Sequence, residues 1–318
     1  MRVRESSHRA QRSSAILAVL AAAFLLTGRG PLAQVRAQTA PAGGPASETR
    51  GAFEVTSELG RKLYAEPDDG TILAAEKKLS ADPKNAKLVL ALSGAQAGRR
   101  QYREAVRTCT KGLVFLPDNP DLLIERGHRE LGLRQFALAQ RDLDRAAALD
   151  PKKIDAFYHL GLAHYFQGQF DQAADAFRIA LRLAANNNSV IDSTNWLYVS
   201  LRRAKKDSEA AQVLQKITPQ VQNTEPHYGF YLRLLHFYQG MLSELETLPP
   251  RPKSPSDTES ELAFDTVGYG VGNWHLCAGD LGRPSELFEE VVSGNAWNAW
   301  GFVGSEVELA GRKAARSR

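Results

Sequence analysis

Three columns of similar residues recur along this chain at a fixed spacing of 34 residues. The columns are Tyr102, Phe136 and Phe170; Ala105, Ala139 and Ala173; and Cys109, Leu143 and Phe177. A fixed period of this length is typical of one helix–turn–helix unit that is copied along a chain, so that neighbouring copies bury a continuous core. The sequence therefore predicts an all-α fold, a right-handed α-solenoid of about five to six helical hairpins whose first and last copies are degenerate.

Small residues recur in the same frame, with Gly127 and Gly161 in the first helix of a copy and Ala146 and Ala180 in the second. Small side chains let the two helices of a hairpin approach closely, and the larger residue that follows each Ala column fills the space beside them. Proline cannot continue a helix, so Pro151 is expected to end one hairpin and start the next.

The pattern of small and large residues is most complete over residues 155–187. The positions that carry it are Phe157, Leu160, Gly161, Ala173, Phe177 and Ala180. In these positions the segment resembles the tetratricopeptide repeat family, although His164 and Ala185 stand where that family has Tyr and Pro. The resemblance implies stacked hairpins that bind other proteins.

The chain is expected to divide into an export segment, a linker and one folded domain. Residues 1–37 are expected to be a signal peptide, 38–52 a flexible linker because they are rich in Ala, Pro, Gly, Ser and Thr, and 53–318 the solenoid. The expected repeats span about 53–85, 86–119, 120–153, 154–187, 191–222 and 262–296, with an aromatic helix at 227–248 and a capping helix at 297–311. A loop at 186–188 is expected to absorb a three-residue slip of the period.

The N-terminus has the pattern of an export signal. Arg2, Arg4, Arg9 and Arg12 precede twelve apolar residues, 15–26, and residues 35–37 form a small-x-small cleavage site. A membrane-spanning helix needs about 20 apolar residues, so a cleaved secretory signal is favoured over an uncleaved anchor. We expect an exported protein, periplasmic or secreted, that touches the membrane only if its signal is not cleaved.

The basic character of the chain belongs to this N-terminal segment. Removing residues 1–37 takes away six Arg and one Glu, so the 40 basic and 36 acidic residues become 34 and 35. The remaining net charge of −1 removes the main sequence argument for nucleic-acid binding.

The C-terminal half carries a second set of small and aromatic positions over about residues 194–311. They include Trp196, Gly272, Leu276, Gly279, Asp280, Leu281, Leu287 and Phe288. In these positions the chain resembles NlpI-type bacterial envelope proteins, which are repeat-built adaptors. Those relatives are lipoproteins, whereas no cysteine follows the hydrophobic run here, so the resemblance implies the adaptor role and not the lipid anchor.

Residues that could support catalysis are scattered. His159 and His164 are five residues apart and point away from each other on one helix, and no phosphate-binding loop, nucleophile elbow or metalloprotease motif is present. We therefore predict no enzyme, no catalytic residue, no metal site and no cofactor.

A stacked array instead presents its first helices along a concave groove. The predicted partner-binding residues of that groove are Asp121, His128, Asp155, Tyr158, His159, Leu162, Tyr165, Asn195, Arg202 and Arg203. Mixed aromatic and polar side chains suit peptide capture. For Tyr158 and Tyr165 the alternative is packing between neighbouring repeats.

The leading hypothesis is an exported scaffold or adaptor of the bacterial cell envelope that binds a peptide segment or partner protein, such as an envelope enzyme or an assembly factor. The alternative is a self-associating structural protein, with a homodimer formed through Trp297 and Trp300 as its simplest form.

Overall fold

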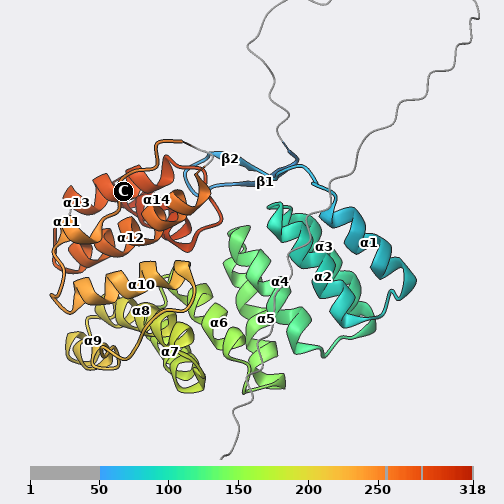
Figure 1. Ribbon diagram of the computed structural model, residues 1–318, viewed down its shortest axis with the longest axis horizontal. Helices are drawn as coiled ribbons and strands as arrows, with labels where there is room; N and C mark the ends of the chain where they lie inside the picture. Colours follow the sequence, from blue (N-terminus) through green and yellow to red (C-terminus); the bar gives the residue numbers. More distant parts are fainter. Residues whose placement is uncertain (1–50, 255–256, 281, 317–318) are drawn as a thin grey trace, which may run out of the picture. The chain divides into compact units, whose positions relative to one another are not determined.

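The computed structural model describes residues 51–254, 257–280 and 282–316, and over these residues it is built almost entirely of α-helices that follow one another in antiparallel hairpins (Figure 1). The predicted fold class, an α-solenoid of helical hairpins, is confirmed. The signal peptide and most of the linker lie outside the described residues, and their assignment stays a prediction. None of the described helices is both long and apolar enough to cross a membrane.

Four hairpins form the repeat-built part of the chain. They are α2 (Ala86–Gly98) with α3 (Tyr102–Phe115), α4 (Pro120–Gly132) with α5 (Phe136–Leu149), α6 (Ile154–Phe166) with α7 (Phe170–Leu183), and α8 (Asn187–Arg203) with α9 (Asp207–Leu214). Consecutive helices pack on each other throughout this series, as expected when each copy contacts its neighbours.

The small-residue column explains why two helices of a hairpin can pack so closely. A Cβ atom added to Gly127 would lie 2.8 Å from Leu143 Cγ, and one added to Gly161 would lie 2.6 Å from the ring of Phe177. Leu143 and Phe177 are fully buried. Each large residue of the second helix therefore occupies the space that glycine leaves open on the first helix.

The hairpin turns share one backbone feature. Arg100, Arg134, Gly168 and Lys205 follow the first helix of their copies and have φ values of 55°, 61°, 74° and 59°. This left-handed conformation reverses the chain at the same point in every copy, and glycine adopts it with least strain.

The first expected repeat is not a helical hairpin, and here the prediction was wrong. Strands β1 (Phe53–Thr56) and β2 (Lys62–Tyr64) form an antiparallel pair, and a single helix, α1 (Thr71–Ala81), follows. The chain turns between the strands because Gly60 has a φ of 86° and the Ser57 hydroxyl accepts hydrogen bonds from the backbone N–H groups of Leu59 and Arg61. These turn residues interrupt the apolar pattern that suggested a first helix.

The fourth hairpin begins earlier than expected. Asn186 caps α8 by accepting a hydrogen bond from the Ser189 backbone N–H at 2.9 Å, so residues 187 and 188 are helical rather than part of a loop. The additional residues lengthen α8 to 17 residues, against 13 in α4 and α6. This extra turn, residues 187–190, places Ser189 on the inner side of the array.

The C-terminal part consists of α10 (Pro226–Tyr238), the short α11 (Glu244–Thr247), α12 (Thr258–Cys277), α13 (Gly282–Val292) and α14 (Trp300–Arg316). The aromatic helix expected at 227–248 ends at Tyr238 because Gly240 is left-handed, with a φ of 74°. Helix α12 packs on α13 and also on α8 and α10, so this part returns toward the array.

The segment before α14 and α14 itself reach the N-terminal elements. Trp297 donates a hydrogen bond from Nε1 to the Tyr64 carbonyl at 3.3 Å, and its ring lies edge-on to Tyr102 at 5.3 Å. Arg134, in the turn after α4, pairs with Glu306 of α14 at 2.7 Å, and both side chains are almost fully buried. These contacts join parts of the chain 172 to 233 residues apart and cover part of the inner side of the array.

Candidate functional site

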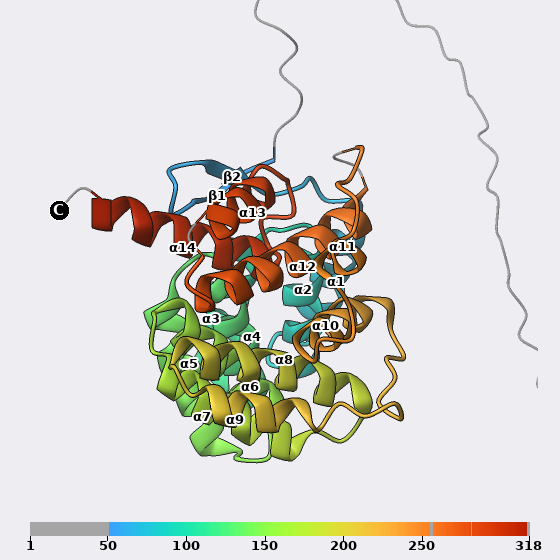
Figure 2. The same ribbon diagram turned by 90° about the vertical axis from the view of Figure 1, so that its left-hand side faces the viewer.

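A cavity of about 620 Å³ lies inside the array. Residues of α2, α4, α6, α8, α10 and α12, together with the starts of α3 and α14, line it. Among these helices, α10 packs on α8 and on α12 (Figure 2). Its aromatic lining residues are Tyr102, Tyr158, Tyr228, Phe230, Tyr231 and Trp300. Its ionisable lining residues other than tyrosine are His128, Arg129, Asp155, His159, Asp192 and His227.

Helical spacing brings these side chains to one side of each helix. On α6 the lining residues Asp155, Tyr158 and His159 are related by three and four positions, and on α8 Asp192 and Ser189 are three apart. One face of each inner helix therefore points into the cavity.

Two histidines from successive repeats stack in the lining. The rings of His128 and His159 have centroids 4.2 Å apart, and Trp300 lies 5.3 Å from His128. The Nδ1–H of His159 donates to the Asp155 carbonyl at 2.8 Å, because a carbonyl oxygen can only accept. Burial lowers the pKa of both histidines, that of His128 well below its usual value, so both are neutral at pH 7.

The positive charge of Arg129 is paired with a carboxylate of the same helix, that of Glu125. Its guanidinium donates to both carboxylate oxygens of Glu125 at 3.0 Å and lies over the ring of Tyr102. An arginine held in this bidentate pair contributes little net charge to the cavity.

The acidic part of the lining consists of Asp155 and Asp192. Burial raises the pKa of Asp192 to about 7, and the nearby carboxylate of Asp155 acts in the same direction. Tyr158, Tyr228 and Tyr231 interact electrostatically with Asp192, and burial raises the pKa of each of these tyrosines above the usual value. The carboxylate therefore lies among neutral aromatic side chains.

The predicted groove residues separate into three groups. His128, Asp155, Tyr158 and His159 line the cavity together. Leu162, Tyr165, Asn195 and Arg203 are on the inner side but are covered by the chain itself. Asp121 and Arg202 lie apart from the cavity in ion pairs with Lys153 at 2.6 Å and with Asp207 at 2.8 Å.

Tyr165 illustrates why the inner side is not an open groove. Its hydroxyl donates to Asn273 at 3.2 Å and accepts from the Tyr269 hydroxyl at 2.9 Å, and only 3% of the residue is exposed. Arg203 pairs with Glu308 and also donates to Asn273. Helices α12 and α14 thus cover the positions at which an extended peptide was expected to bind.

Sequence reasoning missed Asp192, Tyr228, Tyr231 and Trp300 as site residues. The aromatic run around Tyr228 and Tyr231 is visible in the sequence. No residue pattern near it indicates that this helix packs against the inner side of the repeats. Asp192 lies within the repeat expected at 191–222, but the groove residues predicted for that repeat begin at Asn195 and do not include it. Trp300 was assigned to a terminal cap, whereas it contacts His128 and Phe166.

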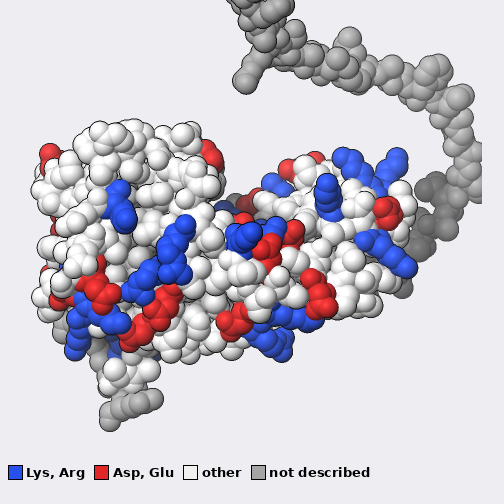
Figure 3. Space-filling view, turned by 90° about the horizontal axis from the view of Figure 1, so that it is seen from below, with Lys and Arg blue, Asp and Glu red and all other residues white. Residues whose placement is uncertain are grey.

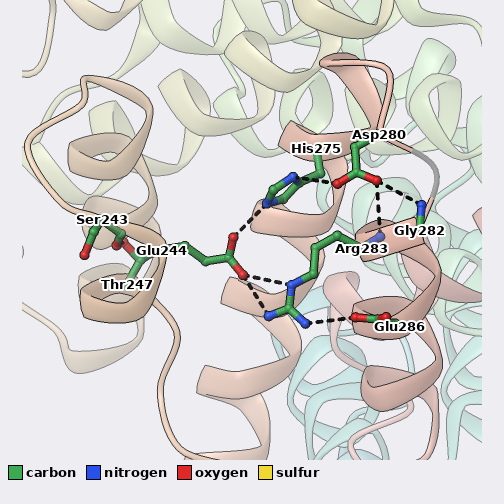
Figure 4. A network of polar contacts seen from close by, with 8 residues as sticks. All are labelled: Ser243, Glu244, Thr247, His275, Asp280, Gly282, Arg283 and Glu286. Carbon is green, nitrogen blue, oxygen red and sulfur yellow. Dashed lines mark hydrogen bonds and ion pairs between the residues drawn. The ribbon is translucent and has the colours of Figure 1, made fainter.

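A separate polar network lies at the C-terminal end of α12 (Figure 4). His275 contacts Glu244 at 2.7 Å and Asp280 at 3.2 Å, and Arg283 donates to the other Glu244 oxygen at 2.7 Å. Burial would raise the pKa of Glu244, but hydrogen bonds from His275 and Arg283 outweigh it and hold that pKa below its usual value. The network holds α11 against α12 and α13. Its charged side chains pair with one another.

Across the described ranges, no three His, Cys, Asp or Glu side chains are placed to hold a metal ion. On the face in Figure 3, Lys and Arg alternate with Asp and Glu rather than forming one broad patch of a single sign. The cavity is therefore the best-defined candidate site in the described part of the chain.

Comparison with known families supports the repeat assignment. Residues 154–187, which contain α6 and α7, match the family model of the tetratricopeptide repeat. The matched segment is the one in which the sequence pattern was most complete. Residues 154–187 are therefore similar to a tetratricopeptide repeat, and stacked helical hairpins of this kind are typical of protein-interaction scaffolds.

Solved structures with partial similarity include the crystal structure of MamA, which is 24% identical, covers 46% of this chain and 85% of that chain, and has a TM-score of 0.42. A MamA structure from Desulfovibrio magneticus RS-1, beginning at residue 41, is 22% identical, covers 46% of this chain and 80% of that chain, and has a TM-score of 0.41. Both likenesses extend over less than half of this chain.

Proposed function

We propose that this protein is a non-catalytic scaffold that binds a short segment of a partner protein in its central cavity. The observation that supports the proposal is the composition of the cavity wall, in which aromatic rings alternate with neutral histidines and two carboxylates. Such a wall offers contact area and directed hydrogen bonds, the combination that suits recognition of a peptide.

The size of the cavity limits what can enter it. Its volume of about 620 Å³ lies within the range of sites that hold small ligands, roughly 300–1,000 Å³. Because α12 and α14 cover Tyr165 and Arg203, a long helix cannot lie along the whole inner side without displacing them. We therefore infer that a few residues of a loop or chain terminus are bound.

The cellular setting is part of the same proposal. The arginine-rich N-terminus followed by an apolar run supports export, and the likeness of residues 194–311 to NlpI-type proteins supports an adaptor role in the bacterial envelope. The partner would then be another envelope protein, an enzyme or an assembly factor.

In-cell cross-linking of the tagged full-length protein tests this function, with mass spectrometry of the proteins recovered from the envelope fraction. Tyr228→Ala removes a half-buried ring from the cavity wall and should abolish recovery of a specific partner. Phe115→Ala removes an exposed ring of α3 that is not part of the cavity and serves as the matched control. Equal recovery with both variants would contradict binding in the cavity.

Self-association is the alternative, and the contacts of Trp297 bear on it. Trp297 is only 3% exposed and packs against Tyr102, while Trp300 packs against His128. These rings are engaged within the chain, so a homodimer would need another surface. Light scattering during size-exclusion chromatography distinguishes the two functions, because a monomer at all concentrations contradicts self-association.

A further inference from the structure

We propose that the segment bound in the cavity contributes a cation, either a Lys or Arg side chain or a free N-terminal amine, that binds between Asp192 and the surrounding tyrosines. This inference rests on the proposed function, because it names the chemistry of the partner's segment. It differs from recognition of a carboxylate terminus, for which the wall would need free basic groups.

The first argument is that Asp192 has no cationic partner. Among the residues that the structure describes, no Lys or Arg pairs with Asp192 or with Asp155, and the only side chain that donates to Asp192 is its neighbour Ser193, at 3.4 Å. Other carboxylates on the inner side are neutralised, as Glu306 is by Arg134 and Glu308 by Arg203.

Four further carboxylates, those of Glu54, Glu130, Glu261 and Asp265, are buried without an ion pair in the described ranges. None of them lines this cavity, so none could contact a ligand in it. Among the described residues, the carboxylates that lack an ion pair and lie on the cavity wall are those of Asp192 and Asp155, and Asp155 is the more exposed of the two.

The second argument is the aromatic surroundings. Tyr158 from α6 and Tyr228 and Tyr231 from α10 lie within electrostatic range of Asp192 and line the same space. The faces of tyrosine rings attract a cation placed within about 6 Å. Rings on two helices around one carboxylate form a site for a positively charged group.

The third argument is the net charge of the wall. His128 and His159 are neutral at pH 7, and the charge of Arg129 is paired with Glu125. His227, which also lines the cavity beside Tyr228, faces the Glu225 carboxylate at 4.0 Å. The carboxylates of Asp155 and Asp192 remain without a cationic partner in the described ranges. The field inside the cavity therefore favours a cation over an anion.

A pH dependence follows from the same groups. Asp155 and Tyr158 face Asp192 from α6, Tyr228 and Tyr231 face it from α10, and Ser193 is its neighbour on α8. The pKa of Asp192 is about 7, and a bound cation favours the ionised carboxylate. Affinity for a segment with Lys or Arg should therefore rise between about pH 6 and pH 8. A free N-terminal amine has an ordinary pKa of about 8, so its own loss of charge offsets that rise.

The test uses a random peptide display library selected against the full-length protein. Enriched peptides should share a Lys or Arg at one position or a free N-terminus, and binding should weaken about tenfold or more in Asp192→Asn. Two modified peptides identify the source of the cation. If replacing the basic residue by norleucine abolishes binding, the source is the Lys or Arg side chain. If acetylating the N-terminus abolishes binding, the source is the N-terminal amine. Asp144→Asn, on the exposed side of α5, is the matched control and should bind as the wild type does.

The outcomes separate this inference from the function on which it rests. Enriched peptides that share no basic group, or that bind Asp192→Asn and the wild type equally, would overturn the inference while leaving peptide capture intact. A library that yields no binder would overturn the proposed function and the inference together. If Asp192→Asn does not fold, the affinity of the wild-type protein for peptides with Lys or Arg and an acetylated N-terminus decides the question. It should rise between about pH 6 and pH 8, and a flat profile contradicts the inference.

Discussion

Two hairpins of this chain are built in the same way and used differently. In the repeat hairpin α6–α7, Gly161 leaves space for Phe177, and in the C-terminal hairpin α12–α13, Gly272 leaves space for Phe288. The inner face of α6 lines the cavity with ionisable residues, whereas α12 is buried along most of its length. One packing unit can therefore serve either as the wall of a site or as the element that closes it.

The difference follows from what each first helix contacts. Helix α6 is packed mainly by its neighbours in the series and by α14, and its residues 155–159 face the cavity, while α12 is packed by α8, α10, α13 and α14. A repeat array of one consistent geometry would leave its inner side open. Here the C-terminal hairpin returns and covers part of that side, and the cavity lies in the part that it leaves accessible.

The strongest test of this comparison is to separate the two parts. Arg134→Met leaves Glu306 buried without its partner and should destabilise the fold by about 3–5 kcal/mol, measured by urea denaturation. Arg134→Met combined with Glu306→Leu should recover much of that loss, because no buried charge remains.

An exposed ion pair provides the control for this measurement. Arg145 pairs with Asp118, and the two side chains are 51% and 67% exposed, so Arg145→Met should change stability by no more than about 0.5 kcal/mol. If Arg134→Met behaved like Arg145→Met, the contact between the turn after α4 and α14 would not contribute to the fold.

The second test compares the two glycines directly. A Cβ at Gly161 would lie 2.6–2.7 Å from three ring atoms of Phe177, whereas one at Gly272 would lie that close to only one ring atom of Phe288. Gly161→Ala should therefore cost about 2 kcal/mol and Gly272→Ala about 1 kcal/mol, after the gain in helix propensity is included.

Gly311 in α14 is the matched control for these two glycines. A Cβ atom added to Gly311 would meet no other atom within 4 Å, so Gly311→Ala should stabilise the fold by up to about 1 kcal/mol. Thermal unfolding of the three variants gives the order of their stabilities. An equal loss at Gly161 and Gly272 would mean that the two hairpins adapt equally well to a methyl group.

The third test concerns the cavity between the two parts. The pKa of Asp192 is raised from 3.8 to about 7 in the folded protein, so folding is opposed increasingly as pH rises from about 4 to about 7, and the penalty is constant above that. Asp192→Asn removes this penalty. The variant should therefore be more stable than the wild type, by on the order of 1 kcal/mol at pH 8 and by less at pH 5, since partial exposure screens the charge.

Urea denaturation of both proteins at the two pH values measures this difference, with Asp144→Asn as the control at an exposed position. A variant less stable than the wild type at pH 8 would show that the carboxylate has a stabilising partner in the folded protein.

The sequence predicted what depends on local spacing. Positions 34 apart, such as Leu143 and Phe177, repeat because each hairpin packs on its own glycine, and this regularity is visible without a structure. Four cavity residues, His128, Asp155, Tyr158 and His159, were found for the same reason, since they lie on the inner face of regular helices.

What the sequence did not predict are contacts between distant segments. Nothing in the spacing of Arg134 and Glu306, or of Tyr165 and Tyr269, indicates that they meet, because neither pair belongs to the repeat frame. The short strands around Gly60 were missed because a turn of a few residues has no period to detect. Asp192 was missed although it lies in the expected repeat at 191–222, because only its place beside Tyr228 and Tyr231 of α10 marks it as a cavity residue.

The smallest expected effect lies in the hairpin turns, where the repeats can be compared one residue at a time. Lys205 and Gly168 occupy the same left-handed position, with φ values of 59° and 74°. A side chain in this conformation costs about 1–2 kcal/mol, whereas glycine costs about 0.5–1 kcal/mol in unfolded-chain entropy, so Lys205→Gly should stabilise by roughly 0.5 kcal/mol. Gly168→Ala should destabilise by about 1 kcal/mol for the converse reason. Lys205 is exposed, so no lost contact complicates the measurement, and a destabilised Lys205→Gly variant would show that entropy outweighs backbone strain at this turn.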